Sequence, residues 1–178
     1  FANELQNYVK DSEKRGFLRK VLKKNKRQKP VMGFYIYGGV GRGKTMLMDL
    51  LFKKIKISSK KRFHFHEFMR DVHEEIRVAR ERKIADPIEL VAGKIFENIS
   101  LICFDEMQIT DIADAMLVGR LFEKIVNMQI SFICTSNRKP GDLYKDGLNR
   151  ELFLPFIDLL ESNLKIFPLN ADRDYRRD

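Results

Sequence analysis

Apolar residues along the chain fall into two patterns, one typical of buried strands and one typical of amphipathic helices. Short, mostly apolar runs at residues 31–37, 99–104 and 130–135 predict strands that are buried on both faces. Residues 62–66 and 164–169 predict two further strands. Helical spacing between the strands predicts helices at about residues 44–54, 67–83, 87–97, 112–127 and 149–162. This alternation predicts an α/β fold of three layers, in which a parallel sheet lies between helices on both of its faces.

The positive charge of the chain is concentrated near its start. The 178 residues carry a net charge of +9. Residues 14–29 contain nine basic side chains and no acidic one, so the rest of the chain is balanced. We therefore divide the sequence into a basic N-terminal arm (1–30), partly helical and ended by Pro30, and a folded core (31–178). Such an arm either is simply solvated or binds an anionic surface of nucleic acid, lipid or acidic protein.

Three further features set the cellular context that we expect. No apolar run approaches the roughly 18 residues that span a bilayer. Cys103 and Cys134 lie inside apolar runs and form no C-x-x-C pair, which predicts reduced core thiols in a cytoplasmic protein. The chain begins with Phe1, and no signal segment follows, so we expect an internal piece of a longer protein.

A glycine-rich loop joins the first apolar run to the first helical segment. Residues 38–45 read GGVGRGKT and match the pattern G-x-x-x-x-G-K-[ST] in the required context of strand and helix. Glycines let main-chain amides approach phosphate oxygens, Lys44 supplies a positive charge to the β and γ phosphates, and the Thr45 hydroxyl can bind magnesium. The pattern therefore predicts that ATP binds here with Mg²⁺. The expected nucleotide contacts are Gly38, Gly39, Val40, Gly41, Arg42, Gly43, Lys44, Thr45 and Met46.

Polar residues end two of the later apolar runs. Asp105 and Glu106 follow Leu101–Phe104, and Asn137 follows residues 130–136. Because parallel strands present their carboxyl ends at one edge of the sheet, these side chains should lie near the loop. We expect Asp105 to hold the magnesium ion and Glu106 to orient the attacking water. Asn137 would sense the γ-phosphate, although a Ser-Asn pair also commonly opens a turn.

Two further sets of side chains are candidates for a functional role. An arginine near the transferred phosphate would stabilise its charge, and Arg150, at the start of a predicted helix, is the first candidate. Arg120, Arg138 and Arg42 are the alternatives. His64 and His66 would face the same side of a strand, with His73 on the next helix. Packing explains these histidines better than a metal site, because no well-spaced fourth ligand exists.

Longer motifs extend the match beyond the phosphate loop. They read GFYIYGGVGRGKTMLMDL at residues 33–50, HFHEFM at 64–69, CFDE at 103–106, TDIADAM at 110–116, TSNR at 135–138, DGLNR at 146–150, FLPFI at 153–157 and DYR at 174–176. In these motifs the chain resembles the ZapE-type bacterial ATPases and their mitochondrial AFG-type relatives. The resemblance implies an AAA+ core and roles as argued above for Lys44, Thr45, Asp105, Glu106 and Asn137.

The same resemblance carries expectations about the whole protein. It implies ATP hydrolysis and the assembly of subunits into a ring or partial ring. Bacterial members are associated with cell division and the tubulin-like protein FtsZ, and mitochondrial members with protein quality control at the inner membrane. Family members continue past the D-Y-R motif, so we expect the helical lid of the AAA+ module to lie outside this sequence.

The prediction is therefore a cytoplasmic AAA+ ATPase that remodels a protein partner, with a possible peripheral contact with the anionic face of the inner membrane. Three alternatives remain open at the level of sequence. A DNA-associated AAA+ protein such as a helicase loader would share the core, but no helix-turn-helix is present, so we do not expect nucleic acid as a partner. A P-loop kinase for small molecules usually lacks a Glu106 equivalent. A nucleotide-gated scaffold would bind ATP and barely hydrolyse it.

Overall fold

The computed structural model describes residues 32–169. Both the predicted arm (1–30) and the D-Y-R motif lie outside these residues. Within them, no helix combines the length and the hydropathy that crossing a bilayer requires. The elements are β1 (Gly33–Tyr37), α2 (Lys44–Lys54), β2 (Lys60–His64), α3 (Phe65–Glu81), α4 (Pro87–Phe96), β3 (Leu101–Asp105), α5 (Ile112–Asn127), β4 (Ser131–Ser136), two 3-10 turns (Pro140–Asp142 and Arg150–Leu152), α6 (Leu154–Asn163) and β5 (Leu164–Pro168).

All five strands form one parallel sheet, as the sequence predicts. Their order is β2-β3-β4-β1-β5, so β1 lies between β4 and β5. The three strands expected to be buried on both faces are the three central ones, β3, β4 and β1. The less apolar strands, β2 and β5, lie at the two edges.

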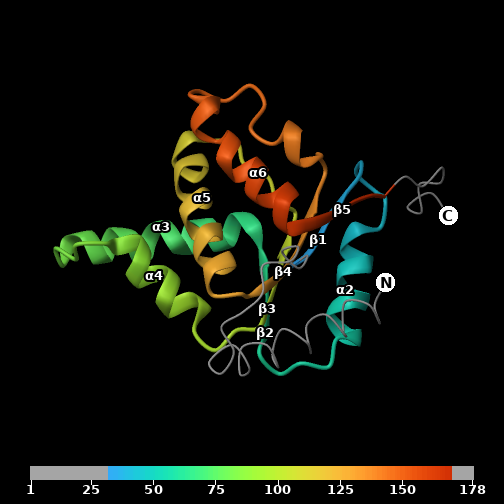
Figure 1. The fold of residues 1–178 in the computed structure, drawn as a ribbon, viewed down its shortest axis with the longest axis horizontal. Coiled ribbons are helices and arrows are strands. Elements are labelled where there is room, and N and C mark those ends of the chain that lie inside the picture. Colours follow the sequence, from blue (N-terminus) through green and yellow to red (C-terminus); the bar gives the residue numbers. More distant parts are fainter. Residues whose placement is uncertain (1–31, 170–178) are drawn as a thin grey trace, which may run out of the picture.

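Helices cover both faces of the sheet, which confirms the three-layer prediction (Figure 1). Helix α2 packs on one face, where Met48 and Leu51 join Phe34 and Ile36 of β1 in a small apolar core. Helices α3, α4, α5 and α6 cover the other face, where Tyr35 joins a much larger core. Alternate residues of β1 thus serve opposite faces, as the geometry of a strand requires.

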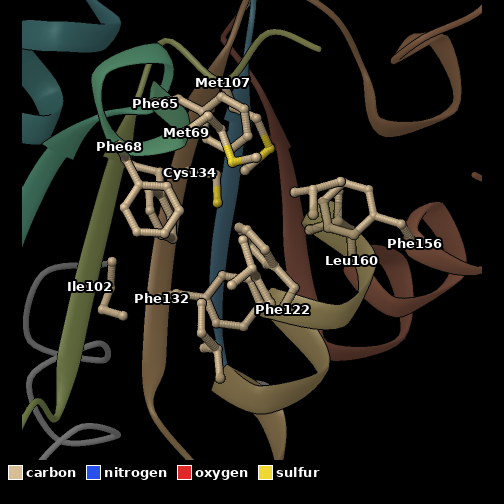
Figure 2. Close-up of a cluster of buried hydrophobic side chains, with 14 of the residues drawn as sticks. Phe65, Phe68, Met69, Ile102, Met107, Phe122, Phe132, Cys134, Phe156 and Leu160 are labelled. Carbon is tan, nitrogen blue, oxygen red and sulfur yellow. The ribbon is translucent and has the colours of Figure 1, made fainter. Parts of the chain in front are cut away.

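Aromatic rings fill much of the larger core (Figure 2). The ring of Phe104, on β3, lies 4.9 Å from Phe68 of α3 and 5.2 Å from Phe122 of α5, measured between centroids. Phe122 in turn lies 5.3 Å from Phe132 on β4 and 5.1 Å from Phe156 on α6. These tilted and edge-to-face contacts tie three helices to two strands, and they place much of the phenylalanine content in the core.

The boundary between β2 and α3 differs from the prediction. A strand was expected at residues 62–66, but β2 runs from Lys60 to His64 and α3 begins directly at Phe65. His64 therefore ends a strand while His66 lies on a helix, so the two histidines do not share one strand face. Helix formation continues back to Phe65 because that ring is completely buried, one turn before Phe68.

The start of the last helix also differs. A helix was expected from residue 149, yet Asn149 has a left-handed backbone (φ 55°) and Arg150 begins a 3-10 turn. Helix α6 starts at Leu154, with Pro155 in its first turn. Proline is common in the first turn of a helix, because main-chain N–H groups there have no acceptor within the helix and the one that proline lacks is not needed.

Candidate functional site

The site elements meet at the carboxyl edge of the sheet. The glycine-rich loop follows β1, Asp105 is the last residue of β3, and Ser136 is the last residue of β4. Strand β4 lies between β3 and β1, so the two ends and the loop are neighbours. The fold therefore brings together the loop, the acidic pair and the segment that carries Asn137, in the place where open parallel sheets bind ligands.

The loop has the backbone of a phosphate-binding turn. Gly41 and Gly43 have positive φ angles, 79° and 75°, which side chains rarely allow. No side chain caps the amino terminus of α2 at Gly43, so that end of the helix can receive an anion. The buried Lys44 folds back over the loop, where its Nζ donates hydrogen bonds of 2.7 Å to the carbonyls of Gly38 and Gly39.

Asp105 is completely buried and is bonded through both of its carboxylate oxygens. Its Oδ2 accepts a hydrogen bond from Nη2 of Arg62 at 2.6 Å. Its Oδ1 accepts from the Thr135 hydroxyl at 2.5 Å. A buried carboxylate needs such partners, because burial without them would cost several kcal/mol.

Arg62 also pairs with a second carboxylate, that of Asp49 on α2. Partial burial by itself lowers the pKa of Arg62, but its hydrogen bonds with Asp105 and Asp49 raise it above the usual value. The hydrogen bond from Arg62 is also the main reason why the pKa of Asp49 is lowered. Arg62 therefore stays charged and joins the helix that follows the phosphate loop to the end of β3.

The end of β4 holds the segment that carries Glu106. The main-chain N–H of Glu106 donates to the Thr135 hydroxyl at 3.0 Å, and that of Met107 donates to the Thr135 carbonyl at 2.7 Å. The Ser136 hydroxyl donates to the Met107 carbonyl at 2.7 Å. These bonds fix Glu106 in a left-handed backbone conformation (φ 56°), with its side chain exposed. A strained residue at such an edge is typical of a functional site.

Asn137 lies on the turn that follows β4, and it is exposed at the same edge. The turn is anchored on both sides of it. The N–H of Arg138 donates to the Ser136 hydroxyl at 3.2 Å, and the Tyr35 hydroxyl donates to the Arg138 carbonyl at 2.9 Å. Burial raises the pKa of Tyr35 far above its usual value, so this hydroxyl remains a donor.

The guanidinium of Arg150 is bonded to its own chain. Its Nη1 donates to the Leu143 carbonyl at 2.6 Å and its Nη2 donates to the Gly141 carbonyl at 2.7 Å. The role of Arg150 toward a nucleotide stays a prediction. Among the alternatives, Arg120 pairs with Asp86 at 3.0 Å on the surface of the α4–α5 pair.

A magnesium ion would find few side-chain ligands here. Within residues 32–169, no group of three or more His, Cys, Asp or Glu side chains could hold a metal ion. His73 instead lies 2.7 Å from Oδ1 of Asp114, between α3 and α5. The Thr45 hydroxyl and the Asp105 carboxylate are oxygen donors of the kind that Mg²⁺ prefers, and Mg²⁺ commonly binds to one or two such groups together with substrate phosphates.

Sequence reasoning missed two residues of this edge, Arg62 and Thr135. Arg62 stands in a run of basic residues on a predicted strand, and Thr135 stands near the end of an apolar run, so each has an ordinary explanation. Each is a polar side chain on a strand that lies next to β3 in the sheet. Recognising them would require the strand order, which the sequence does not state.

Comparisons with known proteins agree on one family. A model of the AFG1-like ATPase family matches residues 2–178. Lactation elevated protein 1 homolog B of Danio rerio is 46% identical over 156 residues, covering 83% of this chain and 31% of that protein. Cell division protein ZapE of Escherichia coli K12 is 42% identical over 147 residues, covering 83% of this chain and 39% of that protein. The chain thus spans less than two fifths of the length of these curated relatives.

A solved structure of similar fold supports the architecture. The replication initiator DnaA bound to AMPPCP and single-stranded DNA has a TM-score of 0.59 and 16% sequence identity, covering 93% of this chain and 45% of that one. At this identity the likeness is one of fold, namely the P-loop AAA+ fold that the sequence predicts.

Proposed function

Since this chain belongs to the AFG1-like ATPase family, we propose that it binds ATP with Mg²⁺, hydrolyses it and uses the energy to remodel a protein partner. One observation supports this most directly. Lys44 lies over a glycine-rich loop at the sheet edge where the buried Asp105 and the exposed Glu106 also lie. Phosphate binding and water activation would then take place in neighbouring positions.

Each side chain has a distinct part in the proposed reaction. The loop amides and Lys44 bind and orient the phosphates, and Mg²⁺, held by Thr45 and Asp105, would neutralise charge on them. Glu106 accepts a hydrogen bond from the attacking water and orients it toward the γ-phosphate. Asn137 contacts the γ-phosphate from the neighbouring strand end. Arg150 acts as a finger on the nucleotide of a neighbouring subunit.

The partner and the place of action form a second, finer part of the proposal. One relative is named a cell division protein, which supports a partner in bacterial cell division such as FtsZ. Membrane protein quality control is the other process that the family suggests. We propose a cytoplasmic protein that forms an oligomer when ATP is bound. Its basic residues 14–29 would allow peripheral contact with an anionic membrane.

The decisive experiment is steady-state ATP hydrolysis measured against protein concentration. It should use this chain and a chain extended by the helical lid of the AAA+ module, each beside its Glu106→Gln variant. We expect activity per subunit to rise with concentration, because a neighbour supplies the finger. The variant should bind ATP normally and turn over at least about 100-fold more slowly, the usual effect of losing a general base.

Two results would count against this function. Normal turnover by Glu106→Gln would remove Glu106 from the reaction. Tight ATP binding without turnover, at all concentrations and in both chains, would instead favour a nucleotide-gated scaffold. The likeness to DnaA concerns the fold alone and gives no reason to propose DNA as the partner.

A further inference from the structure

We propose that Arg62 is a positioning residue that competes with Mg²⁺ for the carboxylate of Asp105 and so sets how tightly the nucleotide site binds the metal ion. The inference rests on the proposed nucleotide site. It adds a residue that the motifs of the phosphate loop and the acidic pair do not include, and it assigns that residue a measurable effect.

The position of Arg62 follows from strand register. Strand β2 pairs with β3 so that Arg62 lies beside Cys103 and His64 lies beside Asp105. Cys103 and Asp105 are two residues apart on β3, so their side chains share a face of the sheet, the face that α2 covers. Arg62, the neighbour of Cys103 on β2, lies on that face as well. From there Nη2 of Arg62 reaches Oδ2 of Asp105 at 2.6 Å.

Electrostatics then give the direction of the effect. Asp105 is completely buried, while the Arg62 side chain is 25% exposed. The guanidinium lies at hydrogen-bond distance from a carboxylate oxygen that a metal ion would also bind, and two positive charges beside one carboxylate repel each other. Because Arg62 is partly solvated and water screens this repulsion, we expect Arg62 to weaken metal binding at Asp105 by about tenfold.

Asp49 makes the proposal specific. It pairs with the other terminal nitrogen of Arg62, and its side chain is 45% exposed on α2. Its carboxylate and that of Asp105 bind the same guanidinium. Removing the charge of Asp49 should leave Arg62 to Asp105 alone and so strengthen the competition with the metal. Changes at Arg62 and at Asp49 should therefore alter metal affinity in opposite directions.

The test measures metal binding directly. Protein saturated with AMPPCP, a non-hydrolysable ATP analogue, is titrated with Mn²⁺, and free Mn²⁺ is followed by electron paramagnetic resonance. Mg²⁺ then displaces the Mn²⁺. The proteins compared are the wild type, Arg62→Met, Arg62→Lys, Asp49→Asn and the double variant of Arg62→Met with Asp49→Asn. Circular dichroism and AMPPCP affinity in EDTA check that each variant is folded and still binds nucleotide.

We expect Arg62→Met to tighten Mn²⁺ binding by about tenfold, because the competing charge is gone. Arg62→Lys keeps the charge and should stay near the wild type. Asp49→Asn should weaken Mn²⁺ binding by about threefold, since the charge it removes is half exposed and screened by water. In the Arg62→Met background, Asp49→Asn should have no effect, because the two residues act as a coupled pair.

Three outcomes would overturn the proposal. Mn²⁺ binding that is unchanged or weaker in Arg62→Met would show that Arg62 only supports the structure. An equal effect of Asp49→Asn with and without Arg62 would show that Asp49 acts on the metal independently. A wild-type protein that binds neither Mn²⁺ with AMPPCP nor AMPPCP in EDTA would contradict the nucleotide site itself, which separates that failure from a failure of Arg62 alone.

Discussion

Lys44 and Asp105 are the two buried charged side chains among the described residues, with exposed fractions of 7% and 0%. Burying a charge costs free energy unless partners compensate it, and both side chains have them. The partners of Lys44 are loop carbonyls, which phosphate oxygens could replace. Those of Asp105 are Arg62 and Thr135. At the scale of the residue, hydrogen bonds within the chain therefore offset the cost of burying both charges.

Replacing Lys44 tests the phosphate loop. We expect Lys44→Ala to abolish nucleotide binding, because the ammonium group that would pair with the β and γ phosphates is lost. Binding of a fluorescent ATP analogue would be measured by anisotropy, with Lys54→Ala, an exposed lysine at the other end of α2, as the matched control. A Lys44→Ala protein that binds ATP normally would refute this role.

Thr135 can be tested with a nearly isosteric change. Thr135→Val removes a hydroxyl that donates to Asp105 and accepts from the N–H of Glu106. Leaving these groups unpaired should lower the free energy of unfolding by about 1–3 kcal/mol. Turnover should also fall, because Glu106 loses one of its anchors. Chemical denaturation and ATPase assays would measure both effects, and Thr135→Ser should restore stability and turnover. A Thr135→Val protein as stable and as active as the wild type would contradict these roles of the hydroxyl.

At the scale of the element, the ends of strands and helices decide where functional side chains lie. Residue 150 was expected to begin an α-helix, but it begins a 3-10 turn whose guanidinium bonds to the carbonyls of Gly141 and Leu143. Asp86 and Asp111, in contrast, cap α4 and α5 through bonds to the N–H groups of Glu89 and Asp114. Caps depend on neighbours in the sequence, so their positions can be predicted.

Arg150 therefore has two roles to separate, an anchor within its chain and a finger toward a neighbour. We expect Arg150→Ala to lower turnover by about 10³-fold or more while ATP affinity stays nearly intact, as losses of arginine fingers do in GTPases. Isothermal titration and single-turnover assays would separate the two quantities. Arg70→Ala, which removes an exposed ion pair with Asp71, is the matched control. An equal loss of affinity and turnover would take Arg150 out of the finger role.

At the scale of the whole molecule, the sheet divides the interior into two apolar cores. Cys103 belongs to the smaller core under α2, and Cys134 belongs to the larger one on the opposite face. Both thiols are free, although they lie on adjacent strands. The two thiols point to opposite faces of the sheet and so do not meet. Both are buried in the core, as the sequence predicts.

The burial of these thiols gives a test of the whole fold. Burial raises the pKa of Cys103 to about 12 and that of Cys134 well above 9.0, so at pH 8 neither is ionised in the folded chain. Only the thiolate reacts readily, so we expect a thiol reagent to modify both cysteines at the rate of unfolding. Modification would be followed by absorbance with and without denaturant. Rapid reaction in the native protein would contradict the two buried positions.

The sequence by itself predicted the five strands, apart from the boundary between β2 and α3, and most of the helices. It also marked the glycine-rich loop and the acidic pair that follow two of these strands. Each of these features depends on residues that are close in the sequence. Examples are the glycines and Lys44 of the loop, and the residues of β1 that face opposite sides of the sheet in turn. The apolar runs also predicted three strands that are buried on both faces, and the structure shows that these are the three central strands of the sheet.

The tertiary structure alone decided how the acidic pair is held. Arg62 is 43 positions from Asp105 in the sequence, and Thr135 is 30 positions beyond it. Their bonds exist because β2 and β4 flank β3 in the sheet. The same holds for the carbonyls that Arg150 contacts and for the separation of the two cysteines. A sequence records which side chains can bond, but strand order and register select the partners, because hydrogen bonds and ion pairs act over only a few ångströms.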